Sequence, residues 1–213
     1  MSFYFDESLV GKLSIAPSLW WRVHHQQFGA TAFNASAAGD ARFSPITRPD
    51  GTVIPTLYAG STPEVAFMET VLHDVPTPSY GVTISLPGAA QEKRRMSCIA
   101  QLGTLILGDL RAIGLRRVGL SRSGLIDSGS SVYRQTRNVA ERVYAANPEL
   151  DGLVWHSRQE DGGKAVVLFE DRLLAHGHRL VAWHDRIDFN AEDVFTECLL
   201  DVLQALGVDA VFG

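Results

Sequence analysis

The chain has 213 residues, of which 46% are hydrophobic and 20% are charged, and its formal net charge is −5. Such a chain can bury a core of its own, and its negative charge argues against a general nucleic-acid binder, because no positive field collects phosphates. Two short basic runs, at residues 93–95 and 116–117, are expected to be solvated surface. No apolar run approaches the roughly 20 residues that span a bilayer and no signal peptide is visible, so we expect a cytoplasmic protein.

The first predicted strand covers residues 19–24 and includes Arg22. A loop rich in glycine, alanine and serine follows at residues 29–40. β-branched and aromatic residues then predict a strand at residues 52–60, in which Pro55 indicates an edge position or a bulge.

A helix is predicted next, after a tight turn. It begins either with residues 61–64, which form the capping box S-x-x-E, or with Thr62 followed by Pro63. It should end soon after residue 74, because the two prolines that follow cannot continue a helix.

Glu69 is a carboxylate within the apolar stripe of this helix. Val65, Met68, Glu69 and Leu72 follow the spacing that places side chains on one helical face, so Glu69 is predicted to point inward. An unpaired ionised carboxylate there costs several kcal/mol, so a cation, a hydrogen-bond donor or water must meet it. Glu69 is therefore a candidate site residue, and a structural ion pair at the edge of the core is the alternative.

The rest of the chain predicts more strands than helices. Strands are expected at residues 80–86, 97–102, 104–107, 150–155, 164–170 and 179–184, and helices at 132–146 and 191–206. Residues 121–131 are predicted to form a flexible loop, a plausible lid. Because strands and helices do not alternate regularly, we predict an α+β fold with a curved, mostly antiparallel or mixed sheet and flanking helices.

Several common site motifs are absent from the sequence. It has no dinucleotide-binding glycine fingerprint, no P-loop, no H-E-x-x-H and no G-x-S-x-G elbow, so the corresponding chemistries lose support. Cys98 and Cys198 lie outside zinc-binding spacings and are expected to be buried thiols. His176 and His178 are more typical of a turn than of a ligand pair, so we predict no metal site.

Four short strings nevertheless occur in a characteristic order. They are W-R-V at residues 21–23, A-R-F at 41–43, L-Y-A-G-S-T-P-E-V-A-F-M-E at 57–69 and D-G-L-V-W-H-S-R at 151–158. Together they resemble the RES domain family over roughly residues 19–170. The family is named for an Arg, a Glu and a Ser in this order, and the matching positions are Arg22, Glu69 and Ser157.

The resemblance implies an enzyme that consumes NAD, with a fold similar to that of ADP-ribosyltransferases. RES proteins are commonly the toxin of a toxin–antitoxin pair whose other member resembles Xre-type helix-turn-helix proteins. They act by NAD phosphorolysis, NAD hydrolysis or ADP-ribosylation of a protein, with NAD as substrate and no metal. Residues 1–170 would form the NAD-binding catalytic domain, and residues 171–213 a strand and helix packed on it.

The resemblance also assigns roles to five residues. Arg22 and Arg42 would bind the pyrophosphate, because a planar guanidinium matches two phosphate oxygens at once. Glu69 would hold a ribose hydroxyl and stabilise positive charge at the anomeric carbon. Tyr58 would stack on nicotinamide or form a hydrogen bond near Glu69, and Ser157 would orient the substrate as a hydrogen-bond donor.

Three of these residues also have an ordinary structural interpretation. Arg22 could lie along its strand and reach solvent, Tyr58 could be a half-buried strand residue, and Ser157 could be a turn residue. In the non-catalytic alternative, Arg22 and Glu69 form a structural ion pair in a nucleotide-binding or interaction module.

We therefore predict a toxin that cleaves NAD at the nicotinamide–ribose bond as a phosphorylase or glycohydrolase and is neutralised by an Xre-like antitoxin. Protein ADP-ribosylation at the same site is the alternative, because phosphate, water and a protein side chain would use the same residues. Neither direct nucleic-acid contact nor a membrane is expected, and a homo-oligomer is considered.

Overall fold

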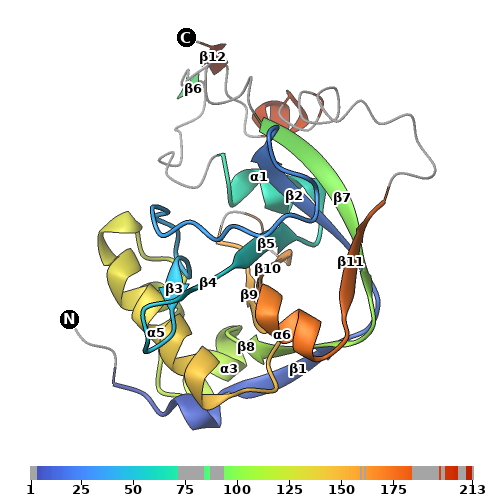
Figure 1. Cartoon of the computed structure of the whole chain (residues 1–213). Coiled ribbons are helices and arrows are strands. Elements are labelled where there is room, and N and C mark those ends of the chain that lie inside the picture. The colour runs from blue at the N-terminus through green and yellow to red at the C-terminus, as the bar shows by residue number, and fades with distance from the viewer. Residues whose placement is uncertain are drawn as a thin grey trace.

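A computed structural model describes residues 4–71, 84–86, 94–158, 160, 162–183, 197, 200–205 and 210–212. Its centre is an eight-stranded sheet (Figure 1). In sheet order the strands are β1 (Gly11–Ile15), β8 (Leu105–Asp109), β9 (Gly152–His156), β10 (Lys164–Phe169), β5 (Thr56–Gly60), β2 (Leu19–His25), β7 (Arg94–Leu102) and β11 (Arg179–Ala182). Only β8 and β9 pair in parallel within this sheet, so the predicted α+β fold with a mixed sheet is confirmed.

Short helices and two small sheets surround this sheet. The helices are η1 (Glu7–Leu9), α1 (Pro63–Met68), α3 (Ala112–Arg117), α4 (Arg122–Leu125), η2 (Ser130–Val132), α5 (Tyr133–Ala146) and α6 (Glu170–Ala175). The small sheets pair β3 (Ile46–Thr47) with β4 (Val53–Ile54) and β6 (Ile84–Leu86) with β12 (Ala210–Phe212). Among the described residues, no helix has the length and apolar character that crossing a bilayer requires.

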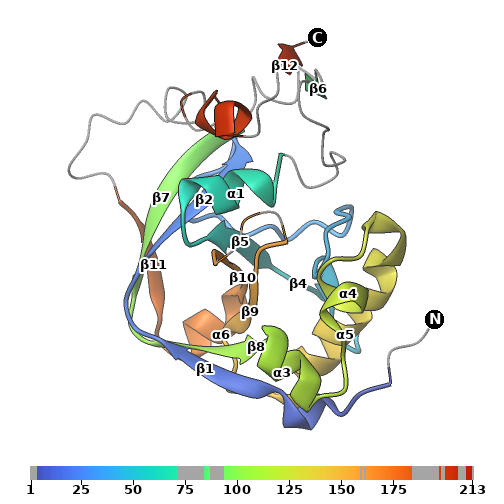
Figure 2. The same cartoon turned by 180° about the vertical axis from the view of Figure 1, so that it is seen from behind.

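The sheet buries side chains on both of its faces. Along β10, Ala165 and Val167 belong to a core that α3 and α5 cover, whereas Val166 and Leu168 belong to a second core with Leu173 of α6. Figure 2 shows α3, α4 and α5 on one side of the sheet, with β2 and β7 bending strongly past α1. Successive side chains of a strand point to opposite faces of the sheet, and here both faces are buried. The central strands therefore consist of almost continuous apolar residues.

Pro55 divides the strand that we predicted at residues 52–60. It lies between β4 and β5, because proline has no N–H to donate to a ladder. The prediction of an edge position is wrong for β5, which lies between β10 and β2 in the middle of the sheet.

Helix α1 starts at the second of the two predicted positions. The Thr62 side chain accepts a hydrogen bond from the Val65 N–H at 3.2 Å, and Pro63 is the first helical residue. The helix ends earlier than predicted, at Met68, and Glu69 is its C-cap. At this end the Thr70 N–H donates to the Phe67 carbonyl, three residues earlier, which is the spacing of a 3₁₀ turn.

The prediction of the other elements is mostly confirmed. The strands at β7, β8, β9, β10 and β11 and helix α5 lie where the pattern placed them, within a few residues. Parts of the predicted elements at residues 80–86 and 191–206 lie outside the described residues, which show β6 at 84–86 and helix at 200–205. β1, α3 and α6 were not predicted, because each has only five or six residues and no extended apolar period. The division of the chain at residue 170 stays a prediction, although β11 is an edge strand of the main sheet and α6 packs on one face of that sheet.

Gly60 fixes the position of α1 against β5. A Cβ at this residue would lie 2.6 Å from the backbone nitrogen of Ala66 and 2.9 Å from Cγ1 of Val65. We predict that Gly60→Ala destabilises the protein by about 1–3 kcal/mol, because the helix backbone has to move away. Chemical denaturation measures this, with Gly29→Ala as the control, since no atom lies within 4 Å of a Cβ there. Equal unfolding free energies for the two variants would contradict the prediction.

Candidate functional site

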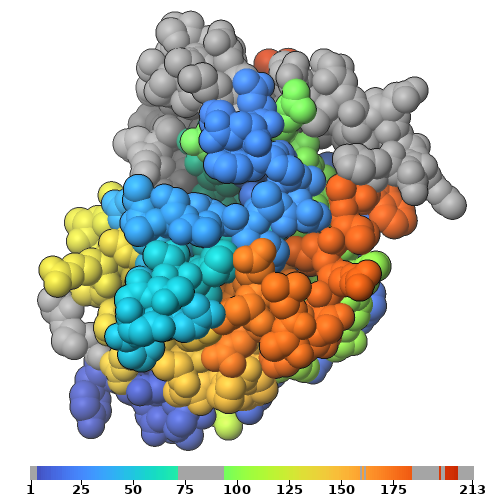
Figure 3. Space-filling view, viewed as in Figure 1, coloured from blue at the N-terminus to red at the C-terminus, as the bar shows by residue number. Residues whose placement is uncertain are grey.

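A cavity of about 480 Å³ lies where β2, β5 and α1 approach the segment of residues 39–44. Its volume is in the range of small-molecule sites. Of the five predicted site residues, Arg22, Arg42, Tyr58 and Glu69 line this cavity and Ser157 does not. Figure 3 shows the blue and cyan surface of the first quarter of the chain between yellow α5 and orange α6.

Arg22 lies on β2 with its guanidinium turned toward the loop at residues 29–40. Its Nη1 donates to the carbonyl oxygens of Ala30 at 2.9 Å and Ala32 at 2.8 Å. Its Nε is buried without a hydrogen-bond partner, and burial lowers the pKa of Arg22 to about 10. No carboxylate of the described residues forms an ion pair with it, so a charged and partly desolvated guanidinium lines the cavity.

Arg42 is 4% exposed and is held mainly by the segment that follows α4. Nη1 donates to the Leu125 carbonyl at 2.8 Å and the Ser128 hydroxyl at 3.1 Å, and Nη2 to the Ser128 carbonyl at 2.9 Å. The guanidinium carbon also lies 5.1 Å from the centre of the Tyr133 ring. Within the part of the chain that the structure describes, three of the five N–H groups are used to fix this segment and two are left without a partner.

The segment of residues 121–131 is not the flexible loop that we predicted. It contains α4 and η2, and Ser121 caps α4 by accepting a hydrogen bond from the Gly124 N–H. Arg122 forms an ion pair with Asp127 at 3.1 Å and also donates to the Ser157 carbonyl at 2.9 Å. A contact between residues as distant in sequence as 122 and 157 leaves no periodic pattern. The small residues of this segment therefore wrongly indicated a flexible loop.

Glu69 and Ser157 form the second feature of the site. The Ser157 hydroxyl donates to Oε1 of Glu69 at 2.7 Å, and the Arg158 backbone N–H donates to the same oxygen at 3.1 Å. Ser157 is 1% exposed and also accepts a hydrogen bond from the Glu160 N–H at 3.2 Å. Glu69 lines the cavity, and the hydrogen bonds from residues 157 and 158 orient its carboxylate.

Tyr58 and Trp155 form an aromatic wall of the cavity. Tyr58 is half-buried on β5, and its hydroxyl accepts a hydrogen bond from the Phe43 N–H at 2.9 Å. Its ring meets the Trp155 ring edge-on at a centroid distance of 6.1 Å. Burial raises the pKa of Tyr58 to about 12, so the phenol is neutral at physiological pH.

The cavity also contains residues that we did not predict. Arg94 lines it, and burial lowers the pKa of Arg94, so the prediction of a solvated basic run at 93–95 is wrong for this residue. Asp40 also lines the cavity and pairs with Arg137 at 2.5 Å. The three lining arginines outnumber the two lining carboxylates, so the cavity is locally positive in a chain with a net charge of −5. Such a cavity favours an anionic ligand.

Comparisons with known proteins agree with this fold. The profile of the RES domain matches residues 19–190 of the chain. Among solved structures, the crystal structure of the M. tuberculosis MbcT–MbcA toxin–antitoxin complex contains a similar chain, with a TM-score of 0.55 and 14% sequence identity. The match covers 87% of this chain and 91% of that one. The comparison with curated proteins gives no match.

Proposed function

The chain belongs to the RES domain family, and from this premise we propose that it cleaves the bond between nicotinamide and ribose in NAD. The observation that carries the proposal is that a desolvated guanidinium and an oriented carboxylate, Arg22 and Glu69, line one cavity. A dinucleotide with an anionic pyrophosphate and a glycosidic bond that breaks through a cationic transition state requires these two groups.

The arginines would bind the pyrophosphate. Among the described residues, Nη2 of Arg22 has no hydrogen-bond partner and Arg42 uses three of its five N–H groups, so both side chains keep donors for phosphate oxygens. Arg94 adds positive charge to the same cavity. In such a partly desolvated place a charged hydrogen bond to phosphate is stronger than at the surface.

Glu69 would stabilise the charge that develops at the anomeric carbon. Both hydrogen bonds that the described residues donate to its carboxylate are accepted by Oε1, which leaves Oε2 for a ribose hydroxyl or for the oxocarbenium-like centre. Nicotinamide leaves as a neutral ring, so no strong acid is needed. Ser157 would position Glu69 rather than touch substrate, because it does not line the cavity.

The non-catalytic alternative depends on an ion pair between Arg22 and Glu69. Among the described residues, Arg22 donates to backbone carbonyls, whereas Glu69 accepts from Ser157 and Arg158. The pair that would make the two residues purely structural is therefore not formed, and this favours the catalytic function.

We also propose that the protein is the toxin of a pair and that an Xre-like helix-turn-helix protein neutralises it. The support is membership of the RES domain family and the fold shared with a chain of a toxin–antitoxin complex. Loss of NAD is a reaction that would harm a cell, which agrees with control by a protein partner.

The proposal is tested by incubating the purified protein with NAD, with and without inorganic phosphate, and identifying the products by mass spectrometry. Release of nicotinamide is expected in both cases if water is the acceptor, and only with phosphate if the enzyme is a phosphorylase. Nicotinamide release that requires an added protein, with ADP-ribose attached to it, would identify a transferase. A folded protein that leaves NAD intact under all three conditions would overturn the proposal.

A further inference from the structure

Asp151, His176 and His178 form a cluster that the proposed NAD chemistry does not use. One possible ligand atom from each of the three lies within 4.8 Å of the other two. Nδ1 of His176 is 2.7 Å from Oδ1 of Asp151, and Nε2 of His178 is 3.6 Å from Oδ2. None of the three lines the cavity described above.

Asp151 is the fixed part of the cluster. It is 0% exposed, and its Oδ2 accepts a hydrogen bond from the Ile106 N–H at 2.8 Å. Its backbone bonds to the Ile106 carbonyl and to the Phe169 N–H, so the residue is held between β8 and β10. A buried carboxylate with one hydrogen bond from the backbone needs further cationic or donor partners.

The two histidines are placed by the end of α6. His176 is the C-cap, and Gly177 follows with a positive φ of 74°. The His178 N–H bonds to the Leu173 carbonyl at 2.8 Å and the Gly177 N–H to the Leu174 carbonyl at 3.1 Å, which is the Schellman arrangement. This turn holds both imidazoles on the same side, toward Asp151.

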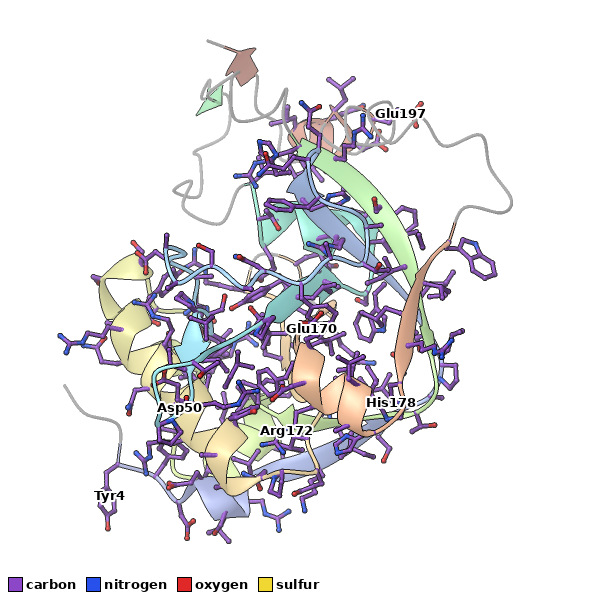
Figure 4. The ribbon with its side chains drawn as sticks, in the orientation of Figure 1. Tyr4, Asp50, Glu170, Arg172, His178 and Glu197 are labelled. Carbon is purple, nitrogen blue, oxygen red and sulfur yellow. The ribbon has the colours of Figure 1, made fainter. Side chains whose placement is uncertain are left out.

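Gly103 gives His178 its position. This glycine separates β7 from β8 with a φ of 106°, and a Cβ on it would lie 2.7 Å from Nδ1 of His178. The imidazole therefore packs against a backbone that has no side chain, with Nε2 directed to Asp151. In Figure 4, His178 lies at the opposite end of α6 from Glu170, near the edge of the molecule.

We propose that Asp151, His176 and His178 bind a divalent transition-metal ion, with Zn²⁺ as the best fit. Two imidazole nitrogens and one carboxylate oxygen are a set that Zn²⁺ and its neighbours in the first row prefer over Mg²⁺ or Ca²⁺. Ligand atoms of a tetrahedral zinc site lie roughly 3.3 Å apart, given bond lengths of about 2.0–2.1 Å. The two imidazoles approach different oxygens of Asp151, at 2.7 and 3.6 Å, and one ligand atom from each residue lies within 4.8 Å of the other two. Binding therefore requires side-chain rotations that bring these three atoms onto one ion.

The surroundings of the cluster match what such a site needs. The Ile106 N–H orients the carboxylate, which is the usual role of a group behind a metal ligand. The side chains of His176 and His178 are 32% and 19% exposed, so a hydrated ion can reach them and keep water as its fourth ligand. The ion would link the turn between α6 and β11 to the start of β9 and stabilise the fold.

The test uses tag-free protein that has been stripped with a chelator and dialysed. Isothermal titration with ZnCl₂ is expected to show one ion per chain, and Zn²⁺ is expected to raise the melting temperature by mass action. Co²⁺ is expected to give the visible absorption of a tetrahedral site. His178→Ala is expected to weaken Zn²⁺ binding by about a hundredfold or more. Replacing a residue that only hydrogen-bonds to a metal ligand already weakens binding by about tenfold to a hundredfold, and His178 would be a ligand itself.

The double variant His176→Ala/His178→Ala is expected to lose the site, and His25→Ala is the matched control on another element. Circular dichroism without metal checks that each variant is folded. Because both histidines are partly exposed, their replacement tests the site without removing the buried Asp151. Absence of Zn²⁺ binding by the wild type, or equal binding by the wild type and the double variant, would overturn the proposal. Neither result depends on NAD turnover, so it is independent of the proposed function.

Discussion

Replacing Glu69 with glutamine is expected to lower nicotinamide release from NAD by about a hundredfold to a thousandfold, the effect of removing one preorganised electrostatic group. The substitution removes the negative charge opposite the developing cation and keeps the size of the side chain. Because the charge matters most in the transition state, the loss should appear in kcat more than in KM. Initial rates of nicotinamide release over a range of NAD concentrations measure both constants.

The fold of this variant should be unaffected. Among the described residues, the two groups that hydrogen-bond to the Glu69 carboxylate are donors, the Ser157 hydroxyl and the Arg158 N–H, and the carbonyl oxygen of a glutamine can accept from both. The melting temperature should therefore stay within a few degrees of the wild-type value. Ser157→Ala, which keeps the charge and removes one orienting hydrogen bond, should have a smaller effect on kcat. Full turnover by folded Glu69→Gln protein would remove this residue from the mechanism.

The fold class was predictable because the strands and helices that decide it are long and periodic. The alternation along β10 and the helical spacing on α5 follow from which faces are buried, and both are visible in the sequence. The positions of strands within the sheets and the ends of helices were less predictable. Pro55 separates β4 of a small sheet from β5 in the middle of the main sheet, and α1 ends at Met68 although no proline or glycine stops it there.

The candidate site was predictable only where residues lie in recognisable strings. Arg22, Arg42, Tyr58 and Glu69 come from three such strings, and they line one cavity. Periodicity alone does not show this convergence, since it requires β2, β5 and residues 39–44 to meet in space. The resemblance to a family supplied that information.

The residues that we missed act through tertiary contacts. Arg94 appeared as part of a basic run, and its place beside the cavity follows only from the pairing of β7 with β2. Asp151 stands beside His176 and His178 because β9 and the end of α6 are neighbours in space. Asp151 and His176 are 25 positions apart, so the sequence did not show that these side chains are neighbours.

Replacing Arg22 with alanine is expected to lower kcat/KM for NAD by about a hundredfold, mostly through KM, because a partly desolvated guanidinium that binds phosphate is worth several kcal/mol. Arg22→Lys should recover only part of this, since an ammonium group cannot match two phosphate oxygens at once. Arg116→Ala is the matched control, because it removes the same charge from an exposed position. Steady-state kinetics with NAD measures the three variants.

The lower kcat/KM of Arg22→Ala could have two causes. The variant loses a contact to the pyrophosphate, and it also loses the hydrogen bonds that hold the loop at Ala30 and Ala32. Nicotinamide riboside separates these causes, because it has the same glycosidic bond and no phosphate. If Arg22 binds phosphate, cleavage of the riboside should be equally slow in the wild type and in Arg22→Ala, while cleavage of NAD differs. A parallel loss with both substrates would show that Arg22 acts by supporting residues 29–40, and pyrophosphate binding would then be left to the other two arginines that line the cavity, Arg42 and Arg94.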